Sequence, residues 1–98
     1  MTSNDQRDFL FELEKLIQSR YNERPEGSYT TRLFEGGVDA IAQKVGEEAV
    51  EVVIASKNED RTEVIYESAD LLYHLLVLLT QREIGLDEIV GELQNRHS

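Results

Sequence analysis

A chain of 98 residues is long enough for one small domain, and its composition excludes several classes of protein. Hydrophobic residues make up 40% and charged residues 31%, which is typical of a globular chain and not of a disordered one. The formal net charge of -10, from 20 acidic and 10 basic residues, disfavours simple electrostatic binding to nucleic acid. The absence of cysteine excludes disulfide and thiolate chemistry.

The N-terminal stretch MTSNDQRDF lacks the basic region and the apolar stretch of a signal peptide. No apolar run approaches the length that is needed to span a bilayer. We therefore expect a cytoplasmic protein with a single domain over residues 1–98, and neither a membrane nor a nucleic acid as its partner.

The first helix is predicted to begin at a capping box over residues 3–6 and to present one apolar face. That face is formed at helical spacing by Phe9, Leu10, Leu13, Leu16 and Ile17. Residues 19–37 hold the only proline, Pro25, and three of the six glycines. They are predicted to form a loop, with at most a short helical turn at residues 31–34.

Two long helices and a short one are predicted to follow. The second helix is expected over about residues 38–56 and the third over about residues 60–82, with Gly85 as its C-terminal stop. A last short helix carries Leu86, Ile89, Val90 and Leu93. The sequence has neither strand alternation nor an internal repeat, so the predicted fold class is all-α.

The second and third helices are too apolar for helices on a surface. Val50 and Ile54 lie opposite the main apolar stripe of the second helix, and leucines at positions 71–79 surround most of the third. A helix that is apolar all round is buried on more than one side. In so short a chain we expect another copy to supply the second cover, giving a homodimer or a higher homo-oligomer. Its core would be a helical bundle of about four helices.

Carboxylates interrupt the apolar surface of the second helix. In the stretch GEEAVEVVIAS (residues 46–56), Glu51 stands among apolar residues. At about 100° per residue, Glu48 and Glu51 fall on one flank of the helix. Lys44 precedes them by one turn on the same flank, and Glu47 lies beside them.

The third helix carries a matching polar stripe. Glu67, Asp70 and His74 follow at i, i+3 and i+7, and Glu63 extends the stripe toward the N-terminus. If the two faces meet, the carboxylates cannot all stay ionised without cations. Oxygen ligands without cysteine suit Mg²⁺, or Mn²⁺, over Zn²⁺. The structural alternative is that the acids are solvated or ion-paired, and for His74 and Glu63 a structural or supporting role is an open interpretation.

These residues resemble a known signature. Glu47-Glu48-x-x-Glu51 followed by Glu67-x-x-Asp70 is similar to the EExxE…ExxD pattern of the MazG-like all-α nucleoside triphosphate pyrophosphatases. Within that superfamily the chain resembles the phosphoribosyl-ATP pyrophosphatases of histidine biosynthesis over nearly its whole length. The stretches that carry this resemblance are RPEGSYTTRL (residues 24–33), KVGEEAVEVVIASKN (44–58) and YESADLLYHLLVLL (66–79).

The resemblance implies Mg²⁺-dependent hydrolysis of phosphoribosyl-ATP to phosphoribosyl-AMP and pyrophosphate, through attack of water on the α–β phosphoanhydride. It implies that the metal ligands are Glu48, Glu51, Glu67 and Asp70, with Glu47 as a further ligand or a neighbour of the ligands. Either Glu47 or Glu51 can accept the proton of the attacking water, and the sequence does not choose between them. The resemblance includes no cyclohydrolase domain, so we expect the stand-alone form of the enzyme.

Basic and hydroxyl side chains are the candidates for holding the substrate. Lys44 could contact a phosphate oxygen, and Gly27 allows a tight turn in the loop before it. We expect the hydroxyls of this loop to recognise the phosphoribosyl group, the alternative being a loop that is simply well packed. The candidates besides Lys44 are Ser28, Tyr29, Thr30, Arg20, Arg32, Lys57 and Arg61, of which the basic ones could equally be solvated surface charges.

Two other functions stay open at the level of sequence. A house-cleaning pyrophosphatase would apply the same metal chemistry to free or damaged nucleotides, and a comparison of substrates separates it from the first reading. A non-catalytic acidic helical module would dimerise through its apolar surface and would need no metal.

Overall fold

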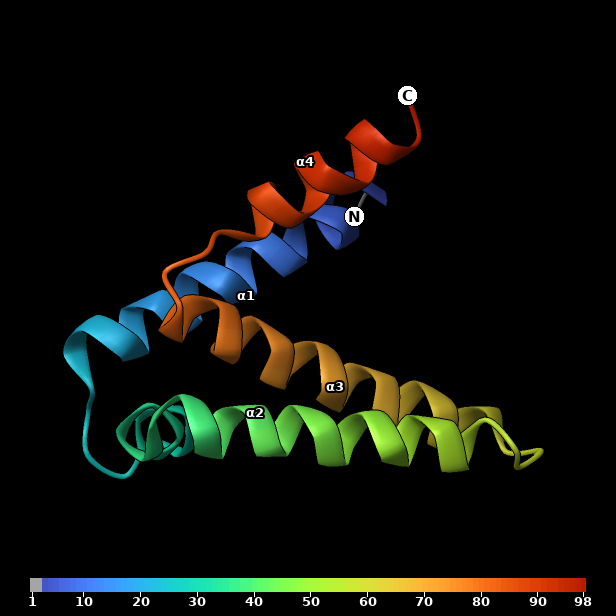
Figure 1. Cartoon of the computed structure of the whole chain (residues 1–98), viewed down its shortest axis with the longest axis horizontal. Helices are drawn as coiled ribbons and strands as arrows, with labels where there is room; N and C mark the ends of the chain where they lie inside the picture. Colours follow the sequence, from blue (N-terminus) through green and yellow to red (C-terminus); the bar gives the residue numbers. More distant parts are fainter. Residues whose placement is uncertain (1–2) are drawn as a thin grey trace.

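The computed structural model describes residues 3–98, which form four helices and the short connections between them. In chain order they are α1 (Ser3–Glu23), α2 (Tyr29–Ala55), α3 (Arg61–Gln81) and α4 (Leu86–Arg96) (Figure 1). No strand occurs within these residues, so the all-α class is confirmed. None of these helices combines the length and the apolar character that a membrane span requires. Of the predicted capping box at residues 3–6, the side chains of residues 3–5 lie outside the described ones.

The connection between α1 and α2 is shorter than predicted. The prediction of a loop over residues 19–37 is wrong, because α1 continues to Glu23 and α2 already begins at Tyr29. Only residues 24–28 connect the two helices, and they contain Pro25. The proline and the glycines therefore correctly predict a loop at residues 24–28 and wrongly predict one at residues 19–23 and 29–37, which lie in helices α1 and α2.

Ser28 begins α2 as its N-cap residue. The Oγ atom of Ser28 accepts a hydrogen bond from the backbone N–H of Thr31 at 3.2 Å, which satisfies one of the free donors at the helix start. Gly27, directly before it, takes a φ of +81°, the left-handed region that the predicted tight turn needs. The helical turn predicted at residues 31–34 is confirmed as part of α2.

Gly37 bends α2 at a single position. Its φ of 84° and ψ of 179° lie in a region that is essentially restricted to glycine. Residues 29–36 therefore form a short helical segment that is set at an angle to residues 38–55, as Figure 1 shows near the start of α2. The second part corresponds to the helix predicted over residues 38–56.

Both ends of α3 agree with the prediction, whereas the role predicted for Gly85 does not. The Oδ1 atom of Asp60 accepts a hydrogen bond from the N–H of Thr62 at 2.9 Å and so caps α3. The prediction that Gly85 stops this helix is wrong. Glu83 takes the left-handed conformation after α3, with a φ of 58°, and Gly85 is the N-cap residue of α4. The N–H of Gly85 donates to the Glu88 carboxylate at 2.8 Å.

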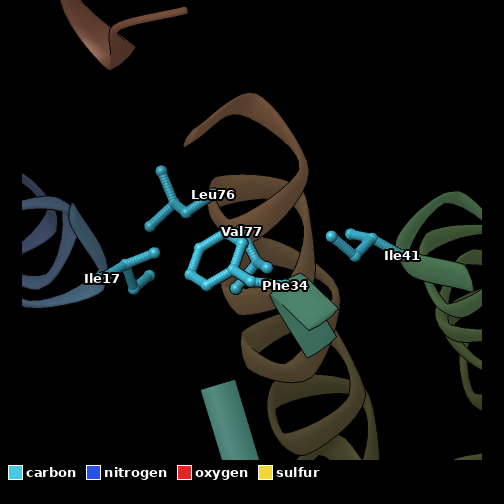
Figure 2. Close-up of a cluster of buried hydrophobic side chains, with 5 residues drawn as sticks. All are labelled: Ile17, Phe34, Ile41, Leu76 and Val77. Carbon is cyan, nitrogen blue, oxygen red and sulfur yellow. The ribbon is translucent and has the colours of Figure 1, made fainter. Parts of the chain in front are cut away.

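A small apolar core lies where α1, α2 and α3 meet. Its buried members are Ile17, Phe34, Ile41, Leu76 and Val77 (Figure 2). Burial of each such side chain contributes about 1.5–3 kcal/mol. This core covers only one side of α2 and of α3. On their other sides, apolar residues are between 47% and 68% exposed, namely Val50, Val53, Ile54, Ile65, Tyr66 and Leu72. The predicted second cover, another copy of the chain, stays a prediction.

The last helix starts against α1. The backbone N–H of Leu86 donates a hydrogen bond to the Glu14 carboxylate at 2.7 Å. In Figure 1, α4 then runs away from the α2–α3 pair. Apolar side chains of α1, α3 and α4 line a cavity of about 320 Å³, among them Leu10, Leu75, Leu79, Ile89 and Leu93.

Replacing Gly37 with alanine is expected to lower the free energy of unfolding by about 1–3 kcal/mol, because a residue with a Cβ is strained at this φ and ψ. The added Cβ would meet no atom within 4 Å, so the loss would report the backbone conformation alone. Gly46→Ala is the matched control, since Gly46 is equally open and lies inside the helical part of α2. We expect this control to be neutral or stabilising by up to about 1 kcal/mol. Urea unfolding measures both variants, and equal stabilities would contradict the kink.

Candidate functional site

The packing of α2 against α3 brings the two acidic flanks together. A carboxylate oxygen of Glu48, one of Asp70 and a ring nitrogen of His74 all lie within 4.8 Å of one another. Glu48 belongs to α2, whereas Asp70 and His74 stand one turn apart on α3. The polar faces of the two helices therefore face each other at one place in the fold.

The two acids Glu48 and Glu51 of α2 differ in burial. Glu48 is buried, with 7% of its surface exposed, whereas Glu51 is exposed in the single chain. In the sequence, Glu51 stands among apolar neighbours, on a helix whose second side another copy is expected to cover. Those neighbours, Val50, Val53 and Ile54, are themselves exposed and form no core within one chain.

The acids of the two helices act on one another through their charges. Loss of hydration raises the pKa of the Glu67 carboxyl above its ordinary 4.5, and the nearby charges of Glu51, Glu48, Asp70 and Glu63 raise it further. The carboxylates of both helices therefore form one acidic cluster. A bound cation relieves repulsion of this kind.

Lys44 places a cation beside the buried acid. Its Nζ atom lies 3.4 Å from an oxygen of Glu48 and 4.0 Å from an oxygen of Glu47. Although loss of hydration disfavours the ammonium, its hydrogen bond to Glu48 and the negative groups around it raise the pKa of Lys44 on balance. One lysine cannot balance all the acids of the cluster, so the site keeps a net negative charge.

His74 links the cluster to the start of α2. Its Nε2 atom lies 2.9 Å from the hydroxyl oxygen of Tyr29, and its Nδ1 atom lies 2.8 Å from the backbone carbonyl oxygen of Asp70. The hydroxyl groups of Thr30 and Tyr73 form a second hydrogen bond between the same two helices. Both ring nitrogens of His74 thus have protein partners, which favours a structural role for this residue over a role as a metal ligand.

Tyr29 belongs electrostatically to the acidic cluster. Burial raises the pKa of the Tyr29 phenol above its ordinary 10.0, the charge of Lys44 opposes this shift, and the charges of Asp70 and Glu48 add to it. The phenol is therefore protonated at neutral pH. The sequence predicts Tyr29 as a hydroxyl of the loop, whereas in the structure its contact with His74 joins residues that are 45 positions apart.

The other predicted residues near the loop also have defined contacts. Ser28 caps α2 through its hydroxyl oxygen, as described above. The guanidinium of Arg32 donates to the carbonyl oxygen of Gly27 at 3.5 Å and lies 5.8 Å from the centroid of the Tyr29 ring. Arg32 therefore remains beside the predicted recognition loop.

The remaining predicted residues lie further along the helices. Arg20 is in the last turn of α1, Lys57 lies between α2 and α3, and Arg61 is the first residue of α3. None of these three forms an ion pair within the described residues. The Glu63 carboxylate accepts a hydrogen bond from the side chain of Asn58 at 3.3 Å, which is a local structural contact.

The donor set of the cluster fits a hard divalent cation. Its acids, Glu48, Glu51, Glu67 and Asp70, supply carboxylate oxygens, and the sequence contains no thiol. Oxygen donors of this kind are the ligands that Mg²⁺ and Mn²⁺ prefer. After loss of hydration, the charges of Glu51, Glu48 and Asp70 raise the pKa of Glu67 further, as expected for acids that repel one another.

Glu51→Gln is expected to raise the thermal stability of the metal-free protein above neutral pH. The charge of Glu51 helps to raise the pKa of Glu67, so the folded state ionises Glu67 less readily than the unfolded chain does. Stability therefore falls as pH rises through the range just above 4.5, and losing the Glu51 charge reduces that fall. Thermal unfolding in a chelator should show a gain at about pH 8 that disappears at about pH 4.

Glu12→Gln provides the control for this measurement, because Glu12 is an exposed acid of α1 and its loss changes only the overall net charge. A Glu51→Gln protein that is less stable than its parent at both pH values would contradict the prediction. It would show that Glu51 forms a stabilising pair instead.

Comparison with known sequences identifies relatives of the chain. Residues 10–97 match the family model described as phosphoribosyl-ATP pyrophosphohydrolase. The chain is 54% identical over 94 residues to the histidine biosynthesis bifunctional protein HisIE of Bacillus subtilis, a match that covers 96% of this chain and 45% of that protein.

Two single-function relatives match over nearly their full length. The phosphoribosyl-ATP pyrophosphatase of Leptospira biflexa is 52% identical over 91 residues, covering 93% of this chain and 99% of the relative. That of Metallosphaera sedula is 55% identical over 89 residues, covering 91% and 96%. The chain spans about half the length of the bifunctional relatives that it matches. From these matches, the chain belongs to the phosphoribosyl-ATP pyrophosphohydrolase family.

Proposed function

We propose that this chain hydrolyses phosphoribosyl-ATP to phosphoribosyl-AMP and pyrophosphate, an early step of L-histidine biosynthesis. The observation that carries the proposal is the meeting of acids from α2 and α3 around the buried Glu48, with Lys44 beside them. The names of the single-function relatives support the choice of substrate.

Glu48, Glu51, Glu67 and Asp70 would hold Mg²⁺ in this proposal, with Mn²⁺ as an alternative. When bound, Mg²⁺ neutralises charge on the triphosphate and on the leaving pyrophosphate and lowers the pKa of water. Without a cation, the acidic cluster would repel a triphosphate. Affinity for the substrate should therefore depend on the metal.

Lys44 would contact a phosphate oxygen of the substrate. Its ammonium lies 3.4 Å from Glu48, and 37% of its side chain is exposed, so a ligand can reach it. An ammonium is a compact charge that suits phosphate binding. Lys44 would thus hold the phosphate next to the acids.

Glu51 is the better candidate for the general base. Its charge acts on Glu67, which places the Glu51 carboxylate electrostatically within the acidic cluster. The Glu47 carboxylate already accepts a hydrogen bond from Gln43 at 3.2 Å and is not among the charges that raise the pKa of Glu67. Glu51 would take a proton from the attacking water while the water oxygen bonds to phosphorus and the α–β anhydride bond breaks.

At saturating Mg²⁺, Glu51→Gln should lower kcat for pyrophosphate release by a factor on the order of 10²–10⁴, the range that general base catalysis contributes. Loss of Glu51 as a Mg²⁺ ligand would instead raise the Mg²⁺ concentration that is needed for half-maximal rate. Glu47→Gln is its matched control, because it removes the same charge one turn away. We expect this control to change kcat by less than about tenfold. If Glu47→Gln is impaired as severely as Glu51→Gln, the assignment of the base is wrong.

The segment before and at the start of α2 is our candidate for recognition of the phosphoribosyl group. Tyr29 and Thr30 are tied to α3 through His74 and Tyr73, which holds this segment beside the acids. Ser28 and Arg32 stay candidates within the same segment. Arg20, Lys57 and Arg61 stay candidates for further phosphate contacts.

The decisive test is pyrophosphate release from phosphoribosyl-ATP, run beside ATP and dUTP, with Mg²⁺ and with a chelator. We expect release only from phosphoribosyl-ATP with Mg²⁺, and a reduced preference over ATP in Ser28→Ala and Tyr29→Phe. Faster release from dUTP would instead indicate a house-cleaning pyrophosphatase. No release from any substrate would contradict an enzymatic function.

We also propose that the protein is a cytoplasmic homodimer or higher homo-oligomer, with no nucleic-acid or membrane partner. The exposed apolar residues of α2 and α3 and the apolar cavity beside α4 support an oligomer, because a solvated surface of this kind is unfavourable. The biosynthetic relatives support the cytoplasmic location.

A further inference from the structure

The hydrogen bonds of His74 determine which of its nitrogens carries a proton. His74 is buried, with 3% of its surface exposed. Its Nδ1 atom lies 2.8 Å from the carbonyl oxygen of Asp70, and a carbonyl oxygen can only accept. Nδ1 therefore donates, and in the neutral ring Nε2 is left as an acceptor.

The partner of Nε2 must then be a donor. That partner is the hydroxyl of Tyr29, at 2.9 Å. A phenol has a single hydroxyl proton, and here that proton forms the hydrogen bond to Nε2 of His74. The Tyr29 oxygen consequently faces the rest of the site with lone pairs only. It can accept a hydrogen bond, but it has no proton left to donate to a phosphate oxygen.

Neighbouring contacts hold this arrangement in place. The ring of His74 packs edge-on against the ring of Tyr29, with centroids 5.9 Å apart, and against that of Tyr73, at 5.3 Å. Tyr73 also bonds the hydroxyl of Thr30, the residue next to Tyr29. The ring of His74 is therefore held between two tyrosine rings, and its hydrogen bond orients the Tyr29 phenol before any ligand arrives, which lowers the entropic cost of binding.

We propose that His74 is a positioning residue that orients Tyr29 as a hydrogen-bond acceptor for a hydroxyl of the ribosyl part of the substrate. Ribose hydroxyls can donate to a lone pair, whereas ionised phosphate oxygens cannot. The hydroxyl ligand rests on the proposed function. The hydrogen bond from Tyr29 to His74 does not.

Two replacements of His74 separate its two hydrogen bonds. The amide oxygen of glutamine can reach the position of Nε2 and accept from Tyr29. The shorter asparagine can replace only the Nδ1 donor to Asp70. For phosphoribosyl-ATP, we expect His74→Asn to raise KM about tenfold with a smaller change in kcat, and His74→Gln to keep KM within about threefold of the parent.

A double-mutant cycle tests whether His74 acts through Tyr29. Tyr29→Phe should raise KM by about as much as His74→Asn, and the double variant should be no worse than either single variant. His97→Asn is the control for loss of a histidine, because His97 is exposed at the end of α4. Equal losses in His74→Asn and His74→Gln, or single losses that multiply in the double variant, would overturn the proposal.

A spectroscopic measurement tests the geometry without substrate. The sequence contains two histidines, so ¹⁵N resonances of the imidazole rings can be assigned with the His97 variant. At about pH 8 we expect the neutral ring of His74 in the parent protein to be the Nδ1–H tautomer. In Tyr29→Phe, the Nε2 resonance of His74 should shift, whereas the resonances of His97 should not move. An Nε2–H tautomer, or an unmoved Nε2 resonance, would overturn the positioning role.

The two measurements also separate this proposal from the proposed function. If the parent protein releases no pyrophosphate from phosphoribosyl-ATP while the resonances behave as expected, the proposed function fails together with the ribosyl ligand. If release is specific but the resonances do not respond to Tyr29→Phe, the positioning role of His74 alone is wrong.

Discussion

Repulsion between the carboxylates of α2 and α3 is the constraint on which the rest of the molecule depends. Removing a charged carboxylate from water costs several kcal/mol unless it is compensated, and Glu48 is almost fully buried. Lys44 compensates in part, and the charges of Glu51, Glu48 and Asp70 still contribute to the raised pKa of Glu67 after loss of hydration. The apolar packing of Ile41 and Val77 holds the two helices together against this repulsion. The fold thereby keeps ready a site that a cation would stabilise.

The kink at Gly37 connects this site to the core. A straight helix would carry residues 29–36 about 12 Å further along the axis of α2, at 1.5 Å per residue. The bend instead turns this segment back, so that Phe34 packs in the core and Tyr29 reaches His74. The turn at Gly37 thus serves both a core contact and the position of the proposed recognition segment.

Local spacing predicted much of this arrangement, and contacts between distant residues account for what it missed. The i, i+3 spacing of the acids is a property of one helix, so the acidic flank of each helix could be predicted from sequence. That the two flanks meet depends on the packing of α2 against α3, which local spacing does not determine. The spacing does not tell which of Glu48 and Glu51 is buried, because positions about 60° apart on a helix can lie on either side of the boundary between buried and exposed. The glycine pair at positions 36 and 37 suggested a loop, although only Gly37 leaves helical geometry. The bond between Tyr29 and His74 has no local signal at all.

The exposed position of Glu51 relates the proposed oligomer to the proposed metal site. Val50 and Val53 flank Glu51 in sequence and are each 56% exposed in the single chain. A second copy that covered them would also remove water from Glu51, and its repulsion of Glu67 would increase in the lower dielectric. A cation among these acids would relieve more repulsion in the oligomer than in the monomer. Metal binding and assembly would then favour each other, because both act on the same buried charge.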